Sequence, residues 1–391
     1  MTQPAVPASR LAGFYFGYFA LIGAFMPYWN LYLEHLGFEK AVIGLLATIT
    51  VFTRIVAPSV WGYLADHSGQ RMRWVRLGAL AQLLAWCAVL VLPNTLFWLA
   101  VILFFFSFFQ NAILAQFEAV TLFWLGEARE RYGMIRLWGS LGFIAAVFGL
   151  GWWLDLTSVL NLPWAMVVLA LATLLCAWWI AEPPQRLAST HQLVPIRQVL
   201  QQRQVWLFFV VQFLLLFSHA PFYSFYSNYL QDFGYSTRTI GLLWAIGVFA
   251  EVLMFTQSHR VLAWGAERWL LFSCLALTAL RWVLVGYFPN HLSMQIVAQC
   301  LHAFSFALFQ SLAMRLIFRE FNAHQQGRAQ ALYSMMWGLG VALGSLLAGL
   351  YWDRLSGSVI FYIAGGIAAL AALSILCLPE RSAQQNVPKP A

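Results

Sequence analysis

Several ionisable side chains of this sequence lie inside long apolar segments, where a charge is costly unless it has a role. They are Arg54, Glu118, Arg136, Glu251, Arg281, His302 and Arg315, with His219 as a weaker member. Carboxyl and imidazole groups can take up and release protons, whereas guanidinium groups keep their charge and bind anions. The residue types therefore indicate binding of a polar solute and transfer of protons.

Five of these residues form two groups along the chain. Glu118 and Arg136 lie in consecutive apolar segments, so an antiparallel helix pair can bring them together. Glu251, Arg281 and His302 lie in three later segments and form the second group. A structural ion pair is the alternative interpretation for Glu118, Arg136 and Glu251.

The other three ionisable residues have competing interpretations. Arg54 either has a direct role or extends its charge toward the membrane surface or a backbone carbonyl. Arg315 lies near the predicted cytoplasmic end of its segment, which favours the second interpretation. His219, beside Pro221, either faces the solute pathway or is a hydrogen-bonded residue at a kink.

The composition identifies the medium that surrounds these residues. The chain has 391 residues, of which 62% are hydrophobic and 9% charged, against about 25% charged in an average soluble domain. Since a membrane-spanning helix needs about 20 apolar residues, nearly the whole chain is used by spans and short loops. The predicted fold is all-α and polytopic, with twelve spans at 11–34, 40–63, 75–93, 95–124, 134–155, 162–181, 204–231, 238–258, 269–287, 290–318, 329–352 and 357–378.

The positive charges between these spans are distributed unequally. Only Lys40, Arg238 and Arg354 fall on one side, and the remaining loop and terminal Lys and Arg residues fall on the other. By the positive-inside rule both termini are predicted to be cytoplasmic, which requires an even number of spans. Topology thus explains the net charge of +8 better than nucleic-acid binding does. We expect a multi-pass protein of a bacterial inner membrane.

The two halves of the chain are related in sequence. Residues of the first two spans recur 197 positions later, as in Tyr32-Leu33 and Tyr229-Leu230. Between the halves, the proline-containing stretch 182–203 is interpreted as a cytoplasmic linker. The predicted domains are a six-helix bundle at 1–181, this linker, and a second bundle at 204–391. Parallel repeats of this kind place a solute site between the halves in transporters, although a duplicated bundle without transport is an alternative.

The loop after the second span contains a recognisable motif. It reads Gly62-Tyr-Leu-Ala-Asp66-His-Ser-Gly69-Gln-Arg71-Met-Arg73 and resembles the signature of the major facilitator superfamily. The glycines are expected to permit close helix approach and a tight turn. By this resemblance Gly62, Asp66, Gly69 and Arg71 form a conformational latch.

Further strings resemble the oligosaccharide and nucleoside proton symporters of that superfamily. The segments around Glu118, Arg136, Glu251, Arg281 and His302 are similar to helices 4, 5, 8, 9 and 10 of lactose permease. Other strings are similar to the phenylpropionate permease branch, namely Arg136-Leu-Trp-Gly-Ser140, Ala250-Glu251-Val252 and Ala313-Met314-Arg315.

The resemblance implies roles for these residues. Glu118 and Arg136 would hold the substrate, Glu251 and His302 would connect substrate to proton, and Arg281 would tune the proton site. The chain departs from lactose permease at Ser305, which replaces the proton-carrying acid of helix 10, and at Gln299, which replaces a lysine. Glu251 is therefore the first candidate for the proton carrier, and Glu118 the second. Tyr28, Asn30 and Tyr226 lie near the outer ends of repeat-related helices and are further substrate-binding candidates. By the resemblance Phe143 is another, because it stands where lactose permease has its stacking tryptophan.

The predicted function is proton-coupled uptake of a small organic solute by alternating access, with an aromatic carboxylate such as phenylpropionate favoured. A sugar or nucleoside symporter is one alternative. An exporter is another alternative. Drug-type antiporters of this superfamily usually carry a glycine-proline motif in helix 5, whereas the helix 5 glycines of this chain come without a proline, which disfavours export. These glycines are Gly139, Gly142, Gly149 and Gly151. The sequence has no metal-type histidine cluster, nucleophile motif or phosphate loop, and its cysteines indicate neither a metal site nor disulfides. We expect no enzyme activity and no cofactor besides the coupling proton, and a monomer in the bilayer.

Overall fold

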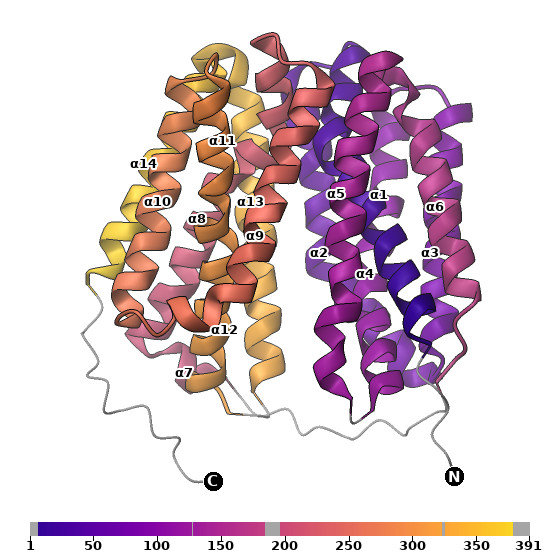
Figure 1. Ribbon diagram of the computed structural model, residues 1–391, viewed down its shortest axis with the longest axis horizontal. Helices are drawn as coiled ribbons and strands as arrows, with labels where there is room; N and C mark the ends of the chain where they lie inside the picture. Colours follow the sequence, from indigo (N-terminus) through magenta and orange to yellow (C-terminus); the bar gives the residue numbers. More distant parts are fainter. Residues whose placement is uncertain (1–6, 127, 184–195, 323–324, 378–391) are drawn as a thin grey trace. The chain divides into compact units, whose positions relative to one another are not determined.

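The computed structural model describes residues 7–126, 128–183, 196–322 and 325–377. All regular elements in these ranges are helical, and twelve helices or helix series are long and apolar enough to cross a membrane. The predicted all-α fold with twelve spans is confirmed (Figure 1). The elements are α1 Ala8–His35, α2 Lys40–Ser68, α3 Arg71–Val91, α4 Leu96–Leu125, η1 Arg129–Arg131, α5 Tyr132–Leu156, η2 Val159–Asn161, α6 Leu162–Trp178, α7 Arg197–Leu200, α8 Arg203–Asp232, α9 Thr237–Val261, α10 Glu267–Tyr287, α11 Leu292–Cys300, η3 Ala303–Leu308, α12 Phe309–Glu320, α13 Gln326–Leu355 and α14 Gly357–Ile375.

The chain forms two compact units whose boundaries cross helices. The first unit contains residues 1–189 and 223–245, and the second contains 190–222 and 246–391. Helices α8 and α9 thus contribute to both units. The predicted division at 182–203 stays a prediction, because residues 184–195 of that linker lie outside the described residues.

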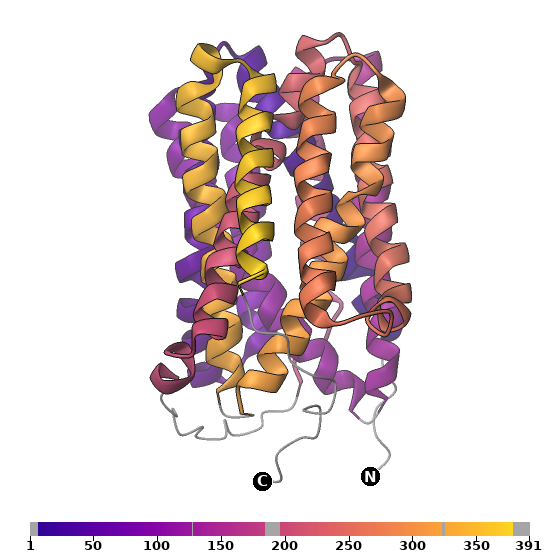
Figure 2. The same ribbon diagram turned by 90° about the vertical axis from the view of Figure 1, so that its left-hand side faces the viewer.

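Each unit is a set of closely packed helices. In the first unit, α1 packs against α5 and α6, while α4 packs against α2 and α3. In the second unit, α14 lies between α10 and α13 (Figure 2). Many apolar side chains on the outer surfaces are exposed, as expected where the surrounding medium is lipid.

The sequence repeat between the two halves corresponds to the same turn after α1 and after α8. Gly37 after α1 and Gly234 after α8 both have positive φ, at 87° and 82°, a backbone conformation that glycine adopts without strain. The amide that follows each glycine bonds the carbonyl five residues before it, at Leu33 and Leu230. These are the same helix-ending hydrogen bonds in both copies.

Helix 10 of the predicted scheme is interrupted. Residues 290–318 are predicted as one continuous span, but the structure divides this segment into α11, the π-helix η3 and α12. A π-helix inserts one additional residue per turn and is often found at functional sites. Here it begins one residue after His302.

Candidate functional site

The first polar cluster lies in the first unit, between α4 and α5. Arg136 Nε is 3.9 Å from Glu118 Oε1, and the Tyr132 hydroxyl donates a hydrogen bond of 3.1 Å to the same oxygen. Tyr132 and Arg136 are four residues apart on α5, so they present their polar atoms on one face. The Arg136 and Glu118 side chains are 29% and 36% exposed, which leaves both accessible to a solute.

Two glycines of α5 allow α1 and the Arg136 side chain to pack closely against this helix. A Cβ at Gly139 would lie 2.7 Å from the Phe19 ring and 2.8 Å from the Arg136 guanidinium. At Gly142 a Cβ would lie 2.2 Å from the Phe16 carbonyl oxygen. Helix α1 therefore approaches α5 closely, and Phe19 lies under the Arg136 guanidinium at 3.9 Å from ring centroid to Cζ, a favourable cation–π distance.

The second cluster lies in the second unit and joins α9, α10 and the interrupted helix. His302 Nε2 is 2.6 Å from Glu251 Oε1, and Arg281 Nη1 is 2.6 Å from His302 Nδ1. Arg281 also donates to Ser305 Oγ and Gln299 Oε1, both at 3.3 Å. The structure thus brings together all three residues of the predicted second group.

The direction of these hydrogen bonds follows from the donor inventory. A guanidinium has only donors, so Nδ1 of His302 must be the acceptor toward Arg281. The ring proton of a neutral His302 is then on Nε2, where it is donated to Glu251. A proton added to Nδ1 would face the Arg281 N–H groups, so Glu251 is the member of this cluster that can gain a proton without losing a hydrogen bond.

Aromatic residues enclose the second cluster. The Arg281 side chain is fully buried, with its Cζ 4.3 Å from the Phe222 ring centroid and 4.4 Å from that of Trp282. His219 Nδ1 lies 2.8 Å from the Leu215 carbonyl oxygen one turn earlier in α8, and its ring is 4.9 Å from that of Trp282. The charges are therefore shielded from lipid by aromatic rings, which strengthens their mutual electrostatic interaction.

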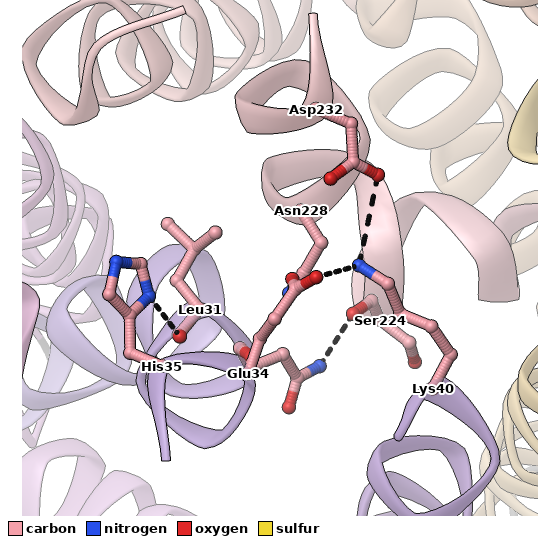
Figure 3. A network of polar contacts seen from close by, with 8 residues as sticks. Leu31, Glu34, His35, Lys40, Ser224, Asn228 and Asp232 are labelled. Carbon is pink, nitrogen blue, oxygen red and sulfur yellow. Dashed lines mark hydrogen bonds and ion pairs between the residues drawn. The ribbon is translucent and has the colours of Figure 1, made fainter. Parts of the chain in front are cut away.

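A third polar cluster lies where α1 ends and α2 begins (Figure 3). Lys40 Nζ is 2.6 Å from Glu34 Oε1 and 3.8 Å from Asp232 Oδ2 at the end of α8. Asn228 of α8 donates to Glu34 Oε2 and to the Asn30 carbonyl. We call Asn30, Glu34, Lys40, Ser224, Asn228 and Asp232 the Lys40 network. It ties α1 and α2 to the last two turns of α8 within the first unit.

A neighbouring contact ties α9 to α5. The Tyr28 hydroxyl donates to the Val147 carbonyl, and Thr237 Oγ1 donates to Asp155 Oδ1 at 3.1 Å. A Cβ at Gly151 of α5 would lie 2.9 Å from the Thr237 carbonyl oxygen of α9. The start of α9 thus joins the first unit through close backbone approach as well as through polar contacts.

The comparisons with known proteins assign the chain to a family. Residues 8–364 match the sequence model of the MFS_1 like family. The chain belongs to this family. The family model covers most of the chain, including every residue of the first and third clusters and the charged residues of the second.

Individual relatives of this MFS_1 like protein are transporters. The probable 3-phenylpropionic acid transporter of Escherichia coli strain K12 is 29% identical over 370 residues, covering 92% of this chain and 94% of that protein. Maltose permease of Geobacillus stearothermophilus is 26% identical over 378 residues, covering 95% of each. The structure of nucleoside transporter NupG aligns with a TM-score of 0.82 at 17% identity, over 95% of this chain and 98% of NupG. The MFS_1 like protein is therefore a multi-pass secondary transporter and not an enzyme.

The signature loop of the MFS_1 like protein is only partly as expected. Gly69 ends α2 with a φ of 65°, which is the predicted tight turn. Gly62 has open space where a Cβ would be, so the expected close helix approach is absent there. Arg71 Nη1 donates to Gln116 Oε1 of α4 at 2.7 Å. The Asp66 side chain lies outside the described residues, and the latch role stays a prediction.

The remaining substrate-binding candidates are deeply buried. Asn30 donates to the Ser224 carbonyl at 2.6 Å and belongs to the Lys40 network, while the Tyr28 hydroxyl is bonded to Val147. Tyr226 is fully buried and Phe143 is 8% exposed. Their role in binding stays a prediction, and Asn30 and Tyr28 hold helices together in this conformation.

Sequence reasoning missed the Lys40 network and the π-helix. Lys40 was visible as one of the few positive charges on its side of the membrane, which was the available signal. Its partner Asp232 is distant in sequence, and nothing local indicates the pairing. The π-helix gives no sequence signal that hydrophobic periodicity can detect.

Proposed function

We propose that this MFS_1 like transporter takes up a small organic solute together with a proton, by alternating access. An aromatic carboxylate such as 3-phenylpropionate is the favoured solute class. The observation that carries this proposal is the largely buried Glu251–His302–Arg281 chain, in which one carboxyl group can gain a proton. The similarity to the probable 3-phenylpropionic acid transporter supports the solute class.

The charges of this cluster offer a way to couple a proton to an anion. When Glu251 is ionised, its negative charge balances that of Arg281, and neutral His302 connects the two. When Glu251 is protonated, the cluster carries a net positive charge in surroundings of low polarity, where charges interact strongly. A bound carboxylate compensates this charge, so protonation and anion binding favour each other. Such coupling is reciprocal by thermodynamic necessity.

A second solute class has specific support. Maltose permease and NupG are among the similar proteins, and Glu118 presents a half-exposed carboxylate beside Tyr132 and Arg136. A carboxylate of this kind can accept hydrogen bonds from the hydroxyl groups of a sugar or nucleoside. This alternative keeps the proton site and changes only the solute.

We also propose the orientation that the charge distribution predicts, with both termini cytoplasmic in a bacterial inner membrane and the protein monomeric. The Lys40 network then lies at the outer end of the first unit. Because it ties α8 to α1 and α2, it must break when the pathway opens to the outside. Alternating access therefore includes the opening of the Lys40 network.

Uptake into proteoliposomes with an imposed inward proton gradient tests the proposal. The panel consists of 3-phenylpropionate and related aromatic acids, maltose and other sugars, and nucleosides. We expect accumulation of aromatic acids above equilibrium, abolished by a protonophore. Since a weak acid also crosses lipid in its neutral form, protein-free liposomes provide the baseline. Accumulation only of sugars or nucleosides would select the alternative, and gradient-independent equilibration would refute proton coupling.

A further inference from the structure

Arg54 lies in the middle of α2, at membrane depth, and has no part in the clusters described above. A charged side chain at this depth normally faces the protein interior or water rather than lipid. The side of α2 that carries Arg54 therefore decides whether the charge faces lipid or protein.

The exposed residues of α2 show which side of this helix faces lipid. Leu45, Phe52 and Val56 are exposed apolar residues that follow one another at intervals of seven and four, and so form the lipid-facing stripe. Arg54 follows Leu45 by nine residues, which at 100° per residue places it on the opposite side of the helix. On that side Ile43 is fully buried, yet Arg54 is exposed. Arg54 is thus open to solvent on the protein-facing side of α2.

Arg54 is within electrostatic range of Tyr18 of α1, which is hydrogen-bonded to α4. Its charge acts on the Tyr18 hydroxyl, as do the charges of Glu118 and Arg136, so Arg54 and the first cluster are both within electrostatic range of Tyr18. The Tyr18 hydroxyl donates to the Gln110 carbonyl at 2.7 Å. Among the described residues the buried side-chain amide of Gln110 has no hydrogen-bond partner. A buried amide without a partner is costly, and a bound solute can supply that partner.

The charge balance of this region favours an anion. Of its three charged side chains, Glu118 lies against Arg136, so the two guanidinium groups exceed the one carboxylate. Helix α4 is also hydrogen-bonded to α2 next to Arg54, because Asn111 Nδ2 donates to Thr53 Oγ1 at 3.0 Å. Arginine binds carboxylates through two parallel N–H donors, which gives both affinity and orientation.

We propose that Arg54 binds the carboxylate of the transported solute and is the residue that selects anionic over neutral solutes. The Gln110 amide adds a further hydrogen bond to the same carboxylate. This inference rests on the proposed function, because it assigns the carboxylate-binding residue for the favoured solute class. It assigns the carboxylate contact to a residue of the first unit.

Equilibrium binding to the purified full-length protein in lipid nanodiscs tests the inference. The probes are 3-phenylpropionate and its neutral analogue 3-phenylpropanol, and the variants are Arg54→Gln and Arg54→Lys. Arg315→Gln is the matched control, since Arg315 is also an exposed arginine within a span. We expect Arg54→Gln to weaken binding of the acid by about tenfold or more, with binding of the alcohol unchanged. Arg54→Lys keeps the charge and is expected to weaken acid binding less.

The outcomes separate this inference from the proposed function. If wild-type protein binds the acid and Arg54→Gln binds it equally well, the role of Arg54 is refuted while carboxylate transport stands. Equal loss of both probes in Arg54→Gln and Arg54→Lys would show a structural role and also refute it. If the wild type binds none of the aromatic acids but binds a sugar or nucleoside, both the inference and the favoured solute class are wrong.

Discussion

Replacing Lys40 by Gln is expected to favour the outward-open conformation of the transporter. Lys40 Nζ lies 2.6 Å from Glu34 and 3.8 Å from Asp232, and the three side chains are 10%, 29% and 49% exposed. The half-exposed Asp232 contributes little at that distance, because solvent screens it. The Glu34 pair is mostly buried, and removing Lys40 leaves the carboxylate with the Asn228 amide as its hydrogen-bond donor among the described residues.

The expected magnitude lies between the values for exposed and buried ion pairs. Exposed pairs contribute about 0–1 kcal/mol, and breaking a fully buried pair costs about 3–5 kcal/mol. For the partly buried Lys40–Glu34 pair we expect about 1–2 kcal/mol. This corresponds to a shift of about 5- to 30-fold in the ratio of open to closed molecules.

Cysteine labelling measures this shift. In a background without the five native cysteines, Ser224→Cys places a thiol at a buried position of the Lys40 network and keeps the backbone carbonyl that Asn30 uses. The labelling rate with a membrane-impermeant maleimide from outside should rise by about 5- to 30-fold in Lys40→Gln. Arg354→Gln, another positive charge predicted on the same side, is the control and should leave the rate unchanged. An unaltered rate in Lys40→Gln would refute the view that this network keeps the outer end closed.

Two other substitutions test the first unit. Arg136→Lys removes the planar guanidinium that lies beside Glu118 and over the Phe19 ring. It should weaken solute binding about tenfold, because the shape and charge of the first cluster change, as isothermal titration calorimetry can measure. Wild-type affinity would count against a role of Arg136 in binding. Gly142→Ala places a Cβ against the Phe16 carbonyl and should lower stability by about 1–3 kcal/mol through forced separation of α1 and α5. Thermal unfolding in detergent detects this change. Gly149→Ala is the control, because a Cβ at Gly149 would meet open space. Equal melting temperatures of the Gly142→Ala variant and the wild type would contradict the close approach of α1 and α5.

The sequence predicted the features that depend on local pattern. Long apolar runs identified the spans, and the repeat identified the equivalent turns at Gly37 and Gly234. The pairing of Glu118 with Arg136 followed from two consecutive antiparallel helices. Helix ends were less accurate: α3 begins at Arg71 rather than 75, because its charged first turn lies outside the apolar run.

Features that depend on distant partners were not predictable in the same way. The Lys40 network joins residues from three helices, α1, α2 and α8, whose sequences do not show which polar groups will meet. The hydrogen-bond direction at His302 required the distances to Arg281 and Glu251. The side of α2 on which Arg54 lies required the exposure of its neighbours, since an arginine in an apolar run is compatible with either side.

Proton movement measured with and without Glu251 tests the central claim most directly. Wild-type and Glu251→Gln proteins are reconstituted into lightly buffered, de-energised vesicles, and the external pH is recorded when 3-phenylpropionate is added, against protein-free vesicles. The account predicts alkalinisation above the protein-free baseline with the wild type and none with Glu251→Gln, although the variant still binds the acid. Equal alkalinisation by both proteins, or specific flux of the acid by the wild type without any pH change, would contradict the assignment of Glu251 as the proton carrier.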